Sequence, residues 1–137
     1  MLAEDYSVLE THVLPVFTIN IWDNGIVHIQ VAGDTMVELQ DIERQYEFLK
    51  NRFNSIDKFI ILVESGENSS LTKEAREFSS LPETNAFTHG TAVIVKTLAE
   101  RLIINFMINV LHQQTMKLRM FDDKKKAINW LLSLKTN

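Results

Sequence analysis

Residues 58–78, "KFIILVESGENSSLTKEAREF", contain the clearest indication of the fold. The first part of this stretch, Lys58 to Glu64, is continuously apolar in the middle, which is typical of a strand buried on both faces. A loop rich in serine follows, and Thr72 then stands where a helix N-cap is expected, with Glu74 in the first turn. Strands that alternate with helices form parallel α/β sheets. The stretch therefore predicts an α/β fold built around this strand.

A hairpin is predicted upstream of this strand. Residues 16–22 and 26–31 are rich in β-branched and aromatic residues, and Asp23-Asn24-Gly25 separates them. Asn and Gly tolerate the positive φ that tight hairpin turns require, so the two strands should be antiparallel neighbours. Thr35 and Glu38 then have the spacing of a capping box. The predicted helix behind them has apolar residues three or four apart, namely Leu39, Ile42, Tyr46, Leu49 and Phe53.

The rest of the chain continues the alternation of strands and helices. Residues 91–96 form a second buried strand, residues 98–111 a helix, and residues 116–121 an edge strand that alternates apolar and basic side chains. Asp122 is the predicted cap of a last helix. The predicted order is β-β-α-β-α-β-α-β-α. It describes a single domain, residues 1–137, with a mixed, mostly parallel sheet of about five strands and an N-terminal antiparallel hairpin. Residues 1–14 fall outside the pattern and are the candidate for a poorly ordered segment.

Composition excludes several classes of protein. A net charge of −4 argues against a general nucleic-acid binder, and the absence of cysteine removes disulfides, thiolate chemistry and cysteine zinc sites. The N-terminus is acidic where a signal peptide would be basic. The longest apolar-rich stretch, residues 102–111, is about half of the roughly 20 residues that a membrane span needs. A cytoplasmic protein without a membrane span is expected.

No complete catalytic or metal-binding signature is present in the sequence. The four glycines, at positions 25, 33, 66 and 90, cannot form a P-loop or a dinucleotide fingerprint. The histidines at positions 12, 28, 89 and 112 are never three or four apart, so they lack metal-ligand spacing. His28 is expected on a partly solvated face of its strand. We therefore predict no enzyme activity, no catalytic residue, no cofactor and no metal.

The loop before Thr72 is the first candidate site. In sheets with parallel strands, ligands and partners usually contact the loops at the carboxyl ends of the strands. Ser69, Ser70 and Thr72 precede a helix, where free N–H groups and the helix dipole favour a phosphate. They are candidate regulatory phosphorylation sites. The alternative is that Thr72 is only a helix cap.

The helix of residues 98–111 is the second candidate site, because it is apolar on almost every side. Leu102, Ile103, Phe106 and Val110 are assigned to the sheet. The remaining apolar side chains are the candidate interface, and they are Ile104, Met107, Ile108 and Leu111. Either a neighbouring helix or a second chain would cover them.

Four segments carry a resemblance to a known family: "FIILVE", "LTKEAREF", "GTAVIVKTLAERLIINFMI" and "RMFDDKKKAINWL". They resemble SpoIIAA-like proteins, uncharacterised bacterial relatives of the STAS domain, which is the fold of anti-sigma-factor antagonists. The resemblance covers roughly residues 17–132. In STAS antagonists a partner kinase phosphorylates a Ser or Thr at the start of the helix after this strand, which falls near Ser69, Ser70 or Thr72. This sequence lacks the family's aspartate before that hydroxyl and its glycine after it.

The sequence is consistent with two functions. The leading hypothesis is a non-enzymatic STAS-like interaction or regulatory domain, with a protein partner or a second copy of itself and with no nucleic acid. The alternative is a carrier of a small molecule or lipid, with an apolar pocket beside the helix of residues 98–111, lined by Phe106, Met107 and Met120.

Overall fold

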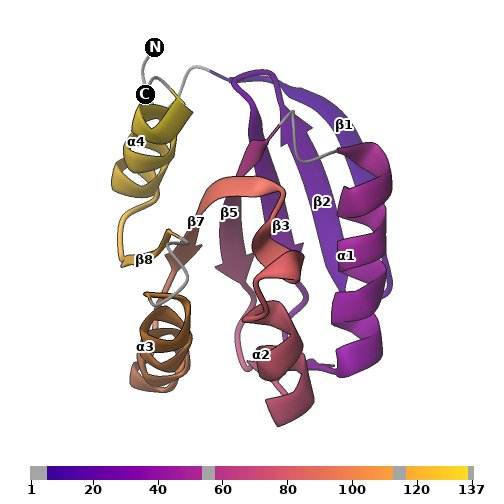
Figure 1. Ribbon diagram of the computed structural model, residues 1–137, viewed down its shortest axis with the longest axis vertical. Coiled ribbons are helices and arrows are strands. Elements are labelled where there is room, and N and C mark those ends of the chain that lie inside the picture. Colours follow the sequence, from indigo (N-terminus) through magenta and orange to yellow (C-terminus); the bar gives the residue numbers. More distant parts are fainter. Residues whose placement is uncertain (1–5, 54–57, 113–116, 136–137) are drawn as a thin grey trace.

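The computed structural model describes residues 6–53, 58–112 and 117–135, which form a six-stranded sheet with helices on both faces (Figure 1). The strands of the sheet are β1 (Val8–Val13), β2 (Phe17–Trp22), β3 (Ile26–Val31), β5 (Phe59–Ser65), β7 (Thr88–Ile94) and β8 (Leu118–Phe121). Two short strands, β4 (Met36–Val37) and β6 (Ser70–Leu71), pair only with each other. The helices are α1 (Leu39–Arg52), α2 (Lys73–Ser79), α3 (Leu98–His112) and α4 (Lys124–Lys135), with a 3-10 turn, η1 (Glu83–Asn85).

The strands lie in the order β1-β2-β3-β5-β7-β8. The first three are antiparallel to one another, and β3, β5, β7 and β8 run parallel. This confirms the predicted mixed α/β sheet with an N-terminal hairpin, with six strands in place of about five. Gly25 has the positive φ of 92° that the Asn-Gly turn requires, and its N–H donates to the carbonyl oxygen of Trp22 at 3.1 Å.

The additional strand, β1, lies within residues 1–14, so the expectation of disorder there is wrong for Val8–Val13; residues 1–5 lie outside the described part. β1 pairs antiparallel with β2 and has an irregular register between Val8 and Glu10. The usual arrangement of apolar side chains inside and polar side chains outside is inverted in β1. Val8, Leu9 and Val13 are exposed, while Glu10 is half-buried. Glu10 Oε2 accepts a hydrogen bond from Arg52 Nη2 of α1 at 2.6 Å. A polar inner face gives no hydrophobic signal, which is why the sequence did not predict this strand.

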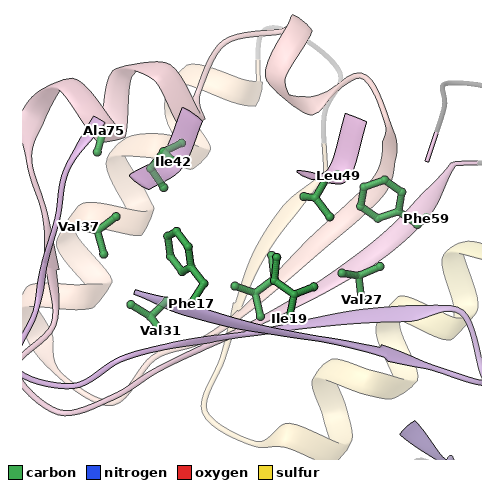
Figure 2. Close-up of a cluster of buried hydrophobic side chains, with 10 residues drawn as sticks. Phe17, Ile19, Val27, Val31, Val37, Ile42, Leu49, Phe59 and Ala75 are labelled. Carbon is green, nitrogen blue, oxygen red and sulfur yellow. The ribbon is translucent and has the colours of Figure 1, made fainter. Parts of the chain in front are cut away.

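The helices divide unequally between the two faces of the sheet. α4 packs on one face through Ala127, Ile128 and Leu131, which contact β5 and β7 side chains that include Ile60 and Leu62. α1 and α2 cover the β2–β3 part of the other face, and α3 covers the β7–β8 part of that same face. Figure 2 shows the cluster under α1, in which the ring of Phe17 extends from the sheet toward Val37 and Ile42. The two faces of the sheet are therefore covered by different helices.

Two helices begin one or more residues later than the sequence predicts. The capping box of α1 joins Glu38 and Asp41 and not Thr35 and Glu38, and the Glu38 N–H donates to Asp41 Oδ2 at 2.9 Å. The insertion of β4 between Thr35 and the helix moves the cap by three residues. In α4 the side chain that accepts an N–H is Asp123, from Lys125 at 2.9 Å, and not Asp122.

The face of α3 that packs on the sheet is only partly the one predicted: Ile103 packs there as expected, but its neighbours in the contact differ. Ile104 and Met107 are buried against Val93 and Val95, whereas Leu102 and Phe106 are exposed. Ile108 is partly buried in the same cluster, so the predicted interface formed by Ile104, Met107 and Ile108 is wrong. The side chains of Val110 and Leu111 lie outside the described residues. Because α3 is apolar on almost every side, spacing alone did not distinguish the two faces. None of the described helices is long and apolar enough to cross a membrane.

Candidate functional site

The loops at the carboxyl ends of β3 and β5 are joined by hydrogen bonds. The Asp34 N–H donates to the Glu67 carbonyl oxygen at 2.7 Å, and Asn68 Nδ2 donates to Asp34 Oδ1 at 3.0 Å. Asp34 and Asn68 both have positive φ, a conformation that Asn and Asp tolerate better than most residues. Behind them β4 pairs parallel with β6. The two loops therefore form one ordered surface.

The three predicted hydroxyl groups lie on the β5–α2 side of this surface, and each has a different local partner. Thr72 Oγ1 accepts the Ala75 N–H at 3.1 Å, which confirms the predicted N-cap. Ser69 Oγ donates to the Gly66 carbonyl oxygen at 3.0 Å. Ser70 Oγ donates to Met36 Sδ at 3.2 Å in an exposed position. Of these three hydroxyl groups, that of Ser70 is the one that contacts a side chain and not a backbone group.

A cavity of about 200 Å³ lies on the same face of the sheet as α1, α2 and α3. Its floor includes Ile61 and Val63 of β5 and Val93 of β7, and its walls come from α1, η1 and α3. The sequence placed an apolar pocket beside α3 but assigned its lining incorrectly. Met107 does line the cavity, whereas Phe106 is exposed on the opposite side of α3, and Met120 packs in the cluster under α3. The cavity depends on the distance between α1 and α3, and no residue pattern in the sequence indicates that distance.

Phe106 belongs to an exposed apolar stripe on the outer side of α3. Leu98, Leu102 and Phe106 are four residues apart, and their exposed fractions are 72%, 62% and 56%. Residues at this spacing lie above one another on a helix. The stripe is the exposed apolar side of α3 within the described residues.

A polar cluster lies on the α4 face of the sheet. His28 Nε2 is 2.8 Å from Glu64 Oε2, and His28 Nδ1 is 3.2 Å from Asn20 Nδ2. Lys124 Nζ lies 3.6 Å from Glu64 Oε1, and Trp22 stacks on the imidazole with ring centroids 5.1 Å apart. His28 is buried, so the expectation of a partly solvated face is wrong, because Trp22 and the start of α4 cover it. Within the described residues no group of three or more acidic or histidine side chains is placed to hold a metal ion.

Glu64 makes the stability of this cluster depend on pH. The hydrogen bond from His28 and the charge of Lys124 hold the pKa of the Glu64 carboxyl below its ordinary value of 4.5. A depressed pKa in the folded state stabilises the fold above the unfolded value, and this stabilisation is lost as the pH falls through the folded value. We expect Glu64→Gln to lower the free energy of unfolding by about 1 kcal/mol at pH 7 and by almost nothing at an acidic pH at which the Glu64 carboxyl of the folded protein is protonated. Urea unfolding at both pH values measures this, with exposed Glu43→Gln as control; an equal loss at both pH values would contradict it.

The sequence of the chain matches one family model over most of its length. A family model described as a domain of unknown function, DUF7793, matches residues 19–135. The chain belongs to the DUF7793 family. The DUF7793 match covers β2 to the end of α4 and therefore includes the strand-end loops, the cavity and the α3 stripe. A search of curated proteins found no match.

A solved structure shows that the DUF7793 chain has a SpoIIAA-like fold. It is an uncharacterised protein from the DUF3478 family with a SpoIIAA-like fold, from Shewanella loihica PV-4. The two are 12% identical with a TM-score of 0.57, and the match covers 96% of this chain and 98% of the other. This confirms the resemblance that the sequence indicated. At this identity the likeness shows the fold alone.

Proposed function

We propose that this chain is a non-enzymatic, cytoplasmic, STAS-like interaction domain that acts through the outer side of α3. The observation that carries the proposal is the stripe of Leu98, Leu102 and Phe106, three large apolar side chains that are each more than half exposed. Contiguous exposed apolar side chains usually mark contact sites. The SpoIIAA-like fold supports the proposal, because the STAS antagonists that the sequence resembles are regulatory domains that interact with a partner kinase.

The partner proposed for this stripe is a second copy of the chain. The three side chains are equally spaced, with Leu102 in the middle. A two-fold axis through Leu102 would place Leu98 of each copy against Phe106 of the other, so the stripe is self-complementary as a two-fold interface requires. Arg101 and Asn105 beside the stripe are exposed and supply a polar rim. Because the stripe is short, the association is weak and reversible.

Replacing Leu102 with Glu should abolish self-association. Sedimentation equilibrium between about 10 µM and about 1 mM should show a monomer–dimer equilibrium for the unchanged protein and a monomer throughout for the variant. The thermal unfolding midpoint should not fall, because Leu102 is exposed. Leu9→Glu is the matched control, since Leu9 is 65% exposed on β1, at the other edge of the sheet from β8 and α3. A monomer for the unchanged protein at the highest concentration would overturn the proposal.

The regulatory part of the proposal concerns Ser70. Its hydroxyl is in the exposed part of the loop, and a phosphate there would leave the Thr72 cap and the Ser69 hydrogen bond in place. Phosphorylation of Ser69 or Thr72 would remove a hydrogen bond that orders the loop or the start of α2. Phosphopeptide mapping of residues 65–72 from the native host tests this part, and an unmodified peptide under all growth conditions contradicts it.

A second candidate function, binding of a small apolar molecule, is favoured by the cavity over β5 and β7. Native mass spectrometry of freshly purified protein tests it through the mass of a retained ligand.

A further inference from the structure

The two edges of the sheet differ in their capacity to pair with another strand. β1, at one edge, has an irregular register between Val8 and Glu10. β8, at the other edge, pairs with β7 in a regular parallel register from Leu118 to Phe121. A regular edge strand presents N–H and C=O groups with which a further strand can pair. Of the two edges, β8 is therefore the better template.

The hydrogen bonds of β8 show which of its backbone groups point outward. The carbonyl oxygens of Lys117 and Phe121 each accept an N–H group from β7 or the residue directly after it, both at 2.9 Å. Backbone groups of alternate residues in a strand point to the same side, so Leu118 and Met120 direct theirs to the open edge. Among the described residues no strand pairs with this side of β8. Two N–H groups and two carbonyl oxygens are thus available to an added strand.

The two faces of β8 differ in chemistry. Leu118 and Met120 are partly buried in the cluster under α3. Lys117 and Arg119 alternate with them and point to the other face, where both are exposed. In the parts of the chain that the structure describes, neither makes an ion pair, and the Arg119 guanidinium lies 5.1 Å from the ring centroid of Phe121. An added strand would therefore meet apolar side chains on one face and two cations on the other.

We propose that the open edge of β8 binds an extended segment of a partner protein in which acidic and apolar side chains alternate. Side chains of residues directly opposite each other in neighbouring strands lie on the same face, with Cβ atoms about 5 Å apart. Acidic residues of the added strand lie opposite Lys117 and Arg119, and apolar residues lie opposite Leu118 and Met120. The backbone hydrogen bonds hold the segment, and the alternation of its side chains selects it.

The same two cations disfavour a competing partner, a second copy of β8. Pairing two copies of this strand would place basic side chains of both on one face and close together, which is unfavourable. A strand with acidic side chains at those positions gains an attraction there instead. Because β8 is short, the association is weak, with an expected Kd of about 0.1 to 1 mM.

Two short peptides of opposite charge test this selectivity. The Glu peptide alternates Glu and Val, and the Lys peptide alternates Lys and Val. Each is titrated into the full chain and followed by amide chemical shifts. The unchanged protein should bind the Glu peptide about ten-fold more tightly than the Lys peptide. The amides of Leu118 and Met120 should shift and become protected from hydrogen exchange.

N-methylated forms of the Glu peptide test pairing through the backbone. Methylating the nitrogens of either its Glu residues or its Val residues removes the N–H groups from one edge of the added strand. One of the two methylated peptides should lose binding, and the other should bind as the parent peptide does. Equal binding by both would show that β8 does not hold the segment by its backbone.

Reversing the two charges should invert the preference. The variant Lys117→Glu with Arg119→Glu should bind the Lys peptide about ten-fold more tightly than the Glu peptide. The control is Lys50→Glu with Lys73→Glu, which makes the same change of charge at exposed sites in α1 and α2 and should keep the original preference. If the reversed variant does not fold, Lys117→Gln with Arg119→Gln replaces it and should bind both peptides equally.

Three results would overturn the inference. They are no binding of the Glu peptide up to about 3 mM, shifts that leave Leu118 and Met120 unchanged, and a preference that survives the charge reversal. The inference does not depend on self-association through α3. Leu102→Glu should therefore bind the Glu peptide as the unchanged protein does, so failure of the proposed dimer and failure of this inference are distinguishable.

Discussion

Replacing Leu62 with Ala should lower the free energy of unfolding by about 3 to 4 kcal/mol, the largest loss expected in the sheet. Leu62 is fully buried at the centre of β5, and it packs in the cluster that contains Ala127, Ile128 and Leu131 of α4. The substitution removes three carbon atoms from a site that lies between the sheet and α4. The loss therefore combines the transfer free energy of those atoms with the cavity that remains.

Ile61→Ala is the matched control for Leu62→Ala, because it removes the same number of atoms from the next residue of the same strand. Ile61 faces the existing cavity and is only partly buried, so the expected loss is about 1 to 2 kcal/mol. Urea unfolding followed by tryptophan fluorescence measures both. Equal losses for the two variants would show that the cavity face of β5 is as closely packed as the α4 face.

Gly66→Ala should lower the free energy of unfolding by about 2 to 4 kcal/mol, because the interlocked loops leave no room for a side chain. A Cβ at Gly66 would lie 2.5 Å from the nitrogen and 2.7 Å from the Cα of Gly33. These are backbone atoms, and they can move away only if the contact between the two loops opens. The hydrogen bond between Asp34 and Glu67 should be lost with that contact.

Gly90→Ala provides the comparison for Gly66→Ala. A Cβ at Gly90 would also approach an atom at 2.5 Å, but that atom is the terminal Cδ1 of the Leu134 side chain. A side-chain end can rotate away, so the expected loss is less than about 1.5 kcal/mol. Thermal unfolding of the two variants at one pH gives the comparison. A greater loss at Gly90 than at Gly66 would contradict the rigid-loop interpretation.

The elements with a strong local signal were predicted correctly. The Asn24-Gly25 turn requires positive φ, the run from Phe59 to Val63 has no polar residue, and Thr72 precedes a polar helix. Each of these signals comes from residues that are close together in the sequence. They indicate either the backbone conformation or the burial of that segment. They were sufficient for the order of the main elements and for the SpoIIAA-like fold.

The features that depend on distant elements were not predicted. The packed face of α3 depends on where β7 and β8 lie, and an all-apolar helix carries no information about that. His28 is buried where Trp22 of β2 stacks on its ring and Lys124 at the start of α4 lies over Trp22. The cavity exists because α1 and α3 pack on different strands. Such spacings are tertiary properties, and a single sequence gives no direct measure of them.

The edge strand β1 also affects whether the sheet can pair with strands of other molecules. Four of the six residues of β2 are buried, and its outer backbone groups are satisfied by pairing with β1. Without residues 6–14, β2 would become an unpaired edge that can add strands from other molecules. The bulge and the charged side chain of Glu10 make β1 a poor template for such addition. The N-terminal segment, which contributes little to the core, thus limits aggregation.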